Sequence, residues 1–224
     1  MTTRVLLLRH GQTAWNLDGR FMGQTDIPLD ETGLQQAEMA AQRLAREPFQ
    51  AIYSSDLSRA WQTAQAVHQA ILGASAGGSA VRLIAEPRLR EMSFGDWQGL
   101  TYAQIQERYP RQLADWEAEM LGDAPPSGET LSQMVQRAQA AYLEILAAHP
   151  GGCVLIVAHG GTLQILCCLA LGLPPERFWQ LHLSNASLSE LRIHPAGAIL
   201  SLFNDTSHLG SRRDDHPDLD GVMG

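Results

Sequence analysis

Two short segments of this sequence place a histidine next to glycine at the end of an apolar run. Arg9, His10 and Gly11 follow one such run, and His159 follows another and precedes Gly160. A guanidinium group binds phosphate through two parallel hydrogen bonds, and a neutral imidazole can act as a nucleophile. These residue types predict a site that accepts a phosphoryl group on His10.

Positive charge in such a site must come from arginine or protonated histidine, because all 16 basic residues are arginines. Arg9, Arg59 and His159 are the candidates. Two nearby guanidinium groups would lower the pKa of His10 and favour its neutral form. Its second ring nitrogen needs an acceptor, usually a backbone carbonyl. Since phosphoryl transfer mainly needs positioning and compensation of charge, we expect neither a metal nor a cofactor.

The alcohol that leaves the phosphate needs a proton, and Glu91 is the candidate acid. It follows an expected strand and precedes a turn that contains Gly95. A carboxyl group can give a proton to the leaving oxygen and later take one from water. Gly11 would allow the backbone to approach the ligand closely, and Asn16 could add an amide donor.

The elements that must position these residues alternate between strand and helix. Apolar runs predict strands at residues 4–8, 51–54, 81–85, 153–158, 187–194 and 198–203. Helical spacing predicts helices at residues 30–47, 55–71, 102–109, 127–149 and 160–171. This order predicts a three-layer α/β/α sandwich around a mostly parallel sheet. Ligands bind beyond the carboxyl ends of such strands, so we expect His10, Arg59 and His159 to meet at one edge.

Finer local signals divide the chain further. Thr32 and Gln35 have the spacing of a capping box for the first long helix, whose apolar stripe would begin at Leu34. Residues 1–209 are expected to form one domain, with a small and largely irregular cap insertion at about 100–127. Residues 73–80 predict a surface loop, and residues 210–224 a polar, flexible tail.

Composition excludes several classes of partner. The formal net charge of −8 argues against nucleic acid and anionic membranes. No apolar run approaches the length of a membrane span, and the first one is too short for a signal peptide. Three cysteines in apolar segments predict reduced thiols and a cytoplasmic protein. The spacing of four histidines in the C-terminal part of the chain fits no metal site; these are His182, His194, His208 and His216.

Five segments closely resemble motifs of the histidine phosphatase superfamily, also called phosphoglycerate mutase-like. They are residues 9–16, 23–29, 54–60, 91–99 and 157–161. The resemblance spans roughly residues 4–208 and implies that fold. It implies that His10 is the phosphorylated nucleophile and Glu91 the proton donor and acceptor, and that Arg9, Arg59 and His159 bind the phosphoryl group. The expected substrate-binding residues are Gly11, Gln12, Thr13, Asn16, Gly23, Gln24 and Gly160.

Within this family the choice lies mainly between a phosphatase and a phosphoglycerate mutase. The resemblance implies that mutases carry a longer insertion with a lysine and an arginine pair. Here residues 102–126 hold Arg108 and Arg111 as their only basic residues and five carboxylates. This favours the phosphatase branch, which includes broad-specificity and α-ribazole phosphatases, and a small phosphorylated metabolite as substrate.

A binding protein without activity and a protein phosphatase are less favoured. A non-catalytic phospholigand-binding protein could lack His10 or Glu91, but both are present. A protein phosphatase acting on phosphohistidine would need an open pocket, which the cap disfavours. An exposed strand near the C-terminus could support a homodimer. The segment from Asn204 to His208 has no role assigned by the sequence.

Overall fold

The computed structural model describes residues 1–74 and 81–210. Two predictions fall wholly or partly outside these residues. Of the expected loop at 73–80, residues 75–80 are not described, while Gly73 and Ala74 end a helix. The expected tail is described only at Gly210, so His216 also lies outside.

A six-stranded sheet forms the centre of the fold, in the order β3-β2-β4-β1-β5-β6. The strands are β1 (Thr3–Arg9), β2 (Ala51–Ser54), β3 (Arg82–Ala85), β4 (Cys153–Ala158), β5 (Leu188–His194) and β6 (Gly197–Asp205). Strands β1 to β4 run parallel to their neighbours in this group. Strand β5 pairs antiparallel with β1, and β6 antiparallel with β5. The predicted mostly parallel sheet is therefore confirmed.

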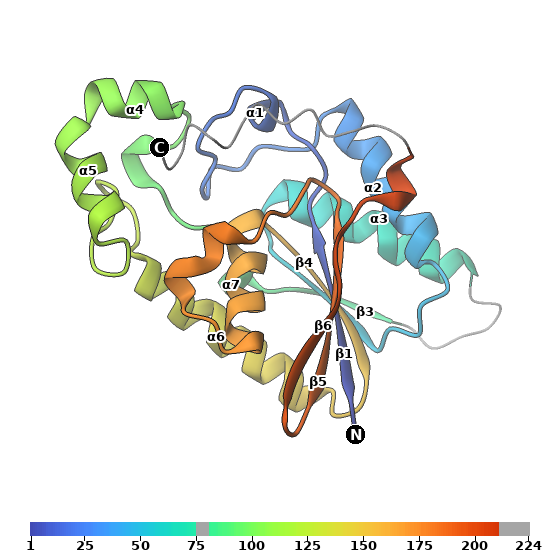
Figure 1. Cartoon of the computed structure of the whole chain (residues 1–224). Coiled ribbons are helices and arrows are strands. Elements are labelled where there is room, and N and C mark those ends of the chain that lie inside the picture. Colours follow the sequence, from blue (N-terminus) through green and yellow to red (C-terminus); the bar gives the residue numbers. More distant parts are fainter. Residues whose placement is uncertain (75–80, 211–224) are drawn as a thin grey trace.

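Helices cover both faces of the sheet. The α-helices of the described residues are α1 (Ala14–Leu17), α2 (Glu31–Leu44), α3 (Ser58–Ala74), α4 (Tyr102–Arg108), α5 (Pro110–Ala118), α6 (Leu131–Ala148) and α7 (Gly160–Leu171). In Figure 1, α2 and α3 lie on one side of the sheet, and α6 and α7 lie on the other. This is the predicted three-layer sandwich, with α4 and α5 set to one side of it.

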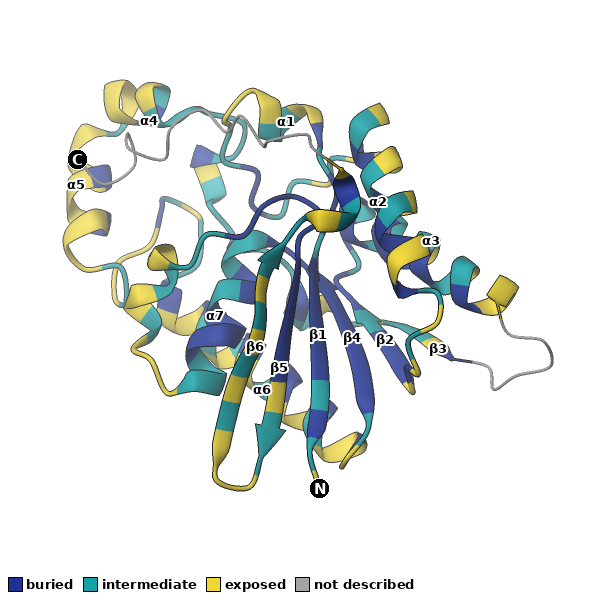
Figure 2. Cartoon of the chain, turned by 45° about the vertical axis from the view of Figure 1, so that its right-hand side comes forward, coloured by how far each residue is buried: buried dark blue, intermediate teal, exposed yellow. Residues whose placement is uncertain are grey.

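The central strands are apolar throughout because both of their faces are covered. In β1, Val5 and Leu7 belong to the core against α6 and α7, whereas Leu6 and Leu8 belong to the core against α2 and α3. Successive side chains of a strand point to opposite faces. A continuous apolar run is therefore what a strand between two helical layers requires, and Figure 2 shows these central strands buried.

Helix α2 begins and packs differently from its prediction. Asp30 is its N-cap, and the carboxylate accepts a 2.7 Å hydrogen bond from the N–H of Gly33. Thr32 therefore lies inside the first turn, and the predicted capping box with Gln35 is wrong. The side chain of Leu34 is 51% exposed, because the buried face of α2 is centred on Gly33 and three alanines.

The structure also differs from two predictions near the cap, one on the start of a helix and one on the helices within the cap. Helix α6 starts at Leu131, four residues after Ser127, because Ser127 adopts the left-handed conformation (φ 61°). Thr130 caps it instead, in a capping box with Gln133. The cap contains a second helix, α5, which the sequence did not predict. Proline can occupy the first turn of a helix, and Pro110 does so in α5.

Candidate active site

The carboxyl ends of β1, β2 and β4 meet at one edge of the sheet, because β4 lies between the other two. Figure 2 shows this edge below α1, opposite the N-terminus. The N–H of His10 donates to Ala158 O, and that of Ser55 to Val157 O, each at 3.0 Å. A cavity of about 240 Å³ opens there. Its lining is Arg9, His10, Asn16, Gly19, Arg20, Phe21, Met22, Gly23, Arg59, Glu91 and Phe94.

His10 is buried, with only 3% of its surface exposed, and lies directly after β1. Its Nδ1 lies 2.6 Å from the carbonyl oxygen of Gly11. A carbonyl can only accept, so Nδ1 carries the proton and Nε2 keeps its lone pair. Burial, then the guanidinium groups of Arg59 and Arg9, hold the pKa of His10 well below its ordinary value. The neutral imidazole and its backbone acceptor match the sequence prediction.

Arg59 lies in the first turn of α3 and is completely buried. Its Nη2 donates to Gly23 O at 2.7 Å, and its Nη1 to Thr25 O at 2.9 Å. Its Nε donates to His159 Nδ1 at 3.1 Å. A guanidinium has five N–H donors, so two are left for a phosphate. Burial lowers the pKa of Arg59 to about 10, which still leaves it charged at neutral pH.

Arg9 ends β1, and its side chain lines the cavity together with that of Arg59. Its Nη1 donates to the carbonyl oxygen of Leu183, in the segment that precedes β5. A Cβ at Gly160 would lie 3.6 Å from Arg9 Nε, so the first turn of α7 packs against this side chain. Both arginines are therefore fixed by backbone neighbours.

His159 is completely buried at the N-cap of α7, and its ring lies edge-on to His10 with centroids 5.1 Å apart. Its Nδ1 accepts from Arg59, so Nε2 carries the proton of the neutral ring and donates to Ser55 Oγ at 2.8 Å. Burial, followed by the neighbouring guanidinium of Arg59, holds the pKa of His159 well below its ordinary value. The fixed charge of the site therefore comes from Arg9 and Arg59, and the charge that the sequence predicts for His159 beside a phosphoryl group stays a prediction. Its contact with phosphate remains a prediction.

Glu91 lies at the cavity with both carboxylate oxygens in backbone hydrogen bonds. Oε1 accepts from the N–H of Met92, and Oε2 from that of Gly161 in the first turn of α7, each at 3.0 Å. A Cβ at Gly161 would lie only 2.7 Å from Oε1. Glycine at this position therefore allows the carboxylate to approach the helix.

The backbone of Glu91 is fixed by side chains from two other parts of the chain. Arg137 of α6 donates to the carbonyl oxygens of Arg90 and Glu91, at 2.6 and 2.9 Å. Gln24 Nε2 donates to the same Glu91 oxygen at 3.1 Å. Gln24 therefore contacts the backbone of Glu91 and does not line the cavity. The sequence predicted that it would lie on the substrate side.

Of the other predicted substrate-binding residues, Asn16 and Gly23 line the cavity. The Oδ1 of Asn16 accepts from the N–H and hydroxyl of Thr13 and from Asn185, which leaves the amide nitrogen as the donor. The remaining predicted residues do not line the cavity, and their contact with substrate stays a prediction. Thr13 caps α1, and the side chain of Gln12 donates to Asp30.

Gly11 permits a close approach between the His10 segment and α2. A Cβ at Gly11 would lie 2.4 Å from Gly33 O, and one at Gly33 would lie 2.0 Å from Gln12 O. Contacts this short are excluded by van der Waals repulsion. The N–H of Gly11 also donates to Thr63 Oγ1 of α3 at 3.2 Å. The glycine therefore permits this close backbone packing, and its predicted approach to the ligand stays a prediction.

Three residues that support the site were not predicted from the sequence. The Nδ2 of Asn185, which is buried, lies 3.2 Å from His10 O. No sequence signal marks Asn185, because it belongs to an irregular segment distant from every motif. Arg137 is equally hidden, as one polar residue in a long helix. Gly161 could have been found, since it stands beside Gly160 at the end of a motif segment.

Aromatic side chains join the cavity wall to the cap. Phe21 and Phe94 line the cavity with ring centroids 5.0 Å apart. Trp97 packs behind them against Trp116 of α5, at 5.6 Å. Both tryptophans are buried, as expected of packing residues.

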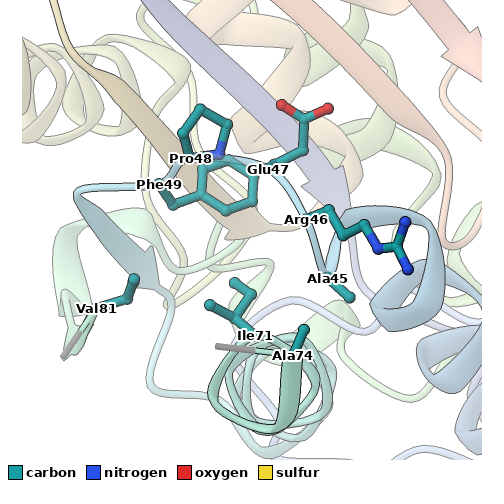
Figure 3. Close-up of a pocket in the computed structure, with 8 residues that line it drawn as sticks. All are labelled: Ala45, Arg46, Glu47, Pro48, Phe49, Ile71, Ala74 and Val81. Carbon is teal, nitrogen blue, oxygen red and sulfur yellow. The ribbon is translucent and has the colours of Figure 1, made fainter. Parts of the chain in front are cut away.

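A second hollow, of about 370 Å³, lies between the end of α2 and the start of β2, beside the last turns of α3 (Figure 3). Only Arg46 and Glu47 bring charge to it, and none of the motif residues lines it. Among residues 1–74 and 81–210, no group of three or more histidine, cysteine or acidic side chains could hold a metal ion. Within the same ranges, no helix combines the length and apolar character of a membrane span.

Comparisons with known proteins agree with this geometry. The sequence profile of the histidine phosphatase superfamily (branch 1) matches residues 5–206. Phosphoserine phosphatase 1 of Hydrogenobacter thermophilus is 30% identical over 207 residues, which cover 92% of this chain and 94% of that protein. A Yersinia enterocolitica protein named "Probable phosphoglycerate mutase GpmB" is 33% identical, with 98% and 99% covered. The solved α-ribazole phosphatase of Shigella flexneri is 27% identical, with 90% and 96% covered and a TM-score of 0.79.

Proposed function

Since the chain belongs to the histidine phosphatase superfamily, we propose that it is a metal-independent phosphomonoesterase that acts through a phosphohistidine on His10. The observation that carries this proposal is the state of His10. Its proton is held on Nδ1 by Gly11 O, and burial with two guanidinium groups keeps the ring neutral. The Nε2 lone pair is therefore available to attack phosphorus.

The reaction proceeds in two transfers. In the first, Nε2 of His10 bonds to phosphorus, the bond from phosphorus to the ester oxygen breaks, and Glu91 gives that oxygen its proton. In the second, Glu91 takes a proton from water, the water oxygen bonds to phosphorus, and the bond to Nε2 breaks. Arg9 and Arg59 compensate the charge on the phosphoryl oxygens throughout.

The size of the cavity supports a small metabolite as substrate. Its volume of about 240 Å³ is below the range of roughly 300–1,000 Å³ that is typical of sites for drug-sized ligands. The similar proteins are named as phosphoserine phosphatase, α-ribazole phosphatase and phosphoglycerate mutase, so small phosphomonoesters of these kinds form the natural panel. A phosphorylated protein is disfavoured because the cavity is small. We also propose that neither nucleic acid nor membrane takes part.

Hydrolysis is favoured over mutase activity by the charges of the cap. Arg108 and Arg111, its basic residues, are exposed on α4 and α5 and do not line the cavity. A mutase must hold a sugar acid while the phosphate is returned to it, and the cap offers no cation for that carboxylate. The third arginine of the cavity lining, Arg20, donates instead to Asp18 and to the carbonyl oxygen of Gly99. Phosphoglycerate mutase remains the second candidate because a mutase-named relative covers nearly the whole chain.

The test compares hydrolysis with mutase flux. We expect release of phosphate from a panel of phosphomonoesters, undiminished by EDTA and abolished in His10→Ala. Loss of activity on chelation would contradict the metal-independent mechanism. In parallel, 3-phosphoglycerate with its bisphosphate primer should give little 2-phosphoglycerate; flux exceeding hydrolysis would favour the mutase. A protein that binds phosphate but turns over no ester would be a phospholigand-binding protein.

A further inference from the structure

The turn of residues 184–187 and Leu183 directly before it contact both Arg9 and His10. On one side, Leu183, directly before the turn, accepts a hydrogen bond from Arg9 Nη1 through its carbonyl oxygen. On the other side, the N–H of Ala186 and the Nδ2 of Asn185 both donate to His10 O, at 3.1 and 3.2 Å. A shift of this turn would therefore move Arg9 and the His10 backbone together.

The turn has an unfavourable backbone conformation. The N–H of Ser187 donates to Ser184 O at 3.1 Å and closes it. Ala186 has a φ of 53° and is completely buried. A residue with a Cβ is strained in this left-handed region, and such strain persists only where the surroundings impose it. The turn therefore needs an outside support.

Asn204, near the end of β6, provides that support. Its Oδ1 accepts from the N–H of Ser184 at 2.7 Å, and its Nδ2 lies 3.5 Å from Ser184 Oγ. Its own N–H donates to Ser189 Oγ of β5 at 3.0 Å, which fixes it to the sheet. Asn204 also has a left-handed backbone (φ 50°), which asparagine tolerates better than most residues. Asparagine therefore fits this position twice, through the left-handed backbone that it tolerates and through the side-chain oxygen that accepts from Ser184.

We propose that Asn204 is a positioning residue of the phosphate site: through Ser184 it fixes the turn that holds Arg9 and His10 in place. This inference rests on the proposed function, and it assigns a role to the first residue of the segment from Asn204 to His208. Through Asn204, the antiparallel hairpin of β5 and β6 would support a site that is built at the ends of parallel strands. Asn204 does not line the cavity, so it acts only through the turn.

The experiment measures inorganic phosphate binding by calorimetry and kcat/KM on an aryl phosphate for three variants. Asn204→Gly keeps the left-handed backbone but removes the bond to Ser184. Asn204→Asp keeps the acceptor oxygen. Ser201→Ala is the matched control, because it removes a hydrogen bond from the same strand, to Glu190 at 2.8 Å, with no link to the turn.

We expect Asn204→Gly to bind phosphate about fivefold more weakly, the effect of losing one partly buried hydrogen bond, with kcat/KM reduced at least as much. Asn204→Asp and Ser201→Ala should both stay within about twofold of the wild type. A merely structural role would lower the melting temperature of Asn204→Gly without changing its phosphate affinity, and that result would overturn the proposal.

Equal losses of affinity in Asn204→Gly and Ser201→Ala would overturn it as well, because they would reflect general loosening of β6. The proposed function fails separately: a wild-type protein that binds phosphate but hydrolyses no ester would contradict the phosphatase reaction and leave the effect of Asn204 measurable by calorimetry. A wild-type protein that binds no phosphate would contradict both.

Discussion

Replacing Gly161 by alanine should separate catalysis from stability, because it adds one methyl group beside Glu91. The Cβ would lie 2.7 Å from Oε1 and 3.4 Å from Cδ of Glu91, while Met134 is at 3.5 Å. Ordinary contacts begin at 3.4 Å, so the carboxylate must retreat by roughly 0.7 Å. Within α7, alanine is favoured over glycine by up to about 1 kcal/mol.

A displacement of about 1 Å can cost on the order of a hundredfold in rate, so we expect kcat to fall roughly ten- to a hundredfold in Gly161→Ala. The loss should be larger for alkyl phosphomonoesters than for nitrophenyl phosphate, because nitrophenolate leaves without needing a proton. The melting temperature should not fall. Steady-state kinetics with both ester types and a thermal melt test these expectations.

The matched control is Gly73→Ala, which adds the same methyl group to α3 where no atom of the described residues, apart from the chain neighbours and the backbone of the same helix, lies within 4 Å of the new Cβ. It should gain comparable stability and keep full activity. The reasoning about Glu91 is refuted if Gly161→Ala retains wild-type kcat on alkyl esters, or if both kinds of ester lose rate equally, since the carboxyl group would then not be the proton donor.

Two further predictions concern pH and the support of Glu91. His10 and His159 have pKa values held below their ordinary 6.5 in the folded state, so the unfolded chain binds more protons as the pH drops. The free energy of unfolding should therefore decrease below about pH 6.5, and His10→Gln should flatten that decrease in urea titrations; an unchanged slope would contradict the burial of a neutral His10. Arg137→Gln removes donors to the Arg90 and Glu91 carbonyls and should lower kcat on alkyl phosphates roughly tenfold, whereas the exposed Arg111→Gln should not; equal rates in the two variants would refute the role of Arg137.

The chemistry-bearing residues could be predicted from the sequence because each follows a recognisable strand. Arg9, His10 and His159 lie at the ends of continuous apolar runs, and parallel strands bring such ends together. Arg59 could be placed because the first turn of a helix follows its strand closely. The neutral state of His10 was predicted from the charge of the neighbouring arginines alone. In the structure, burial is the larger cause of its lowered pKa.

The supports of these residues could not be predicted, because they depend on contacts between distant segments. Asn185 approaches His10, and Asn204 approaches Ser184, because β5 pairs with β1 and β6 pairs with β5. The lowered pKa of His159 could not be predicted because its complete burial beside Arg59 is invisible in the sequence. The helix α5 was missed because the segment around Pro110 lacks a long apolar period, although Leu113 and Trp116 are buried.

Trapping the covalent intermediate tests the central claim most directly. The wild-type protein should be mixed with a radiolabelled phosphomonoester, quenched in alkali within one turnover and mapped by peptide mass spectrometry. We predict acid-labile phosphate on the peptide that contains His10, formed and lost at rates that account for turnover. Phosphate on a different residue, or steady hydrolysis without phosphate on His10, would contradict the account.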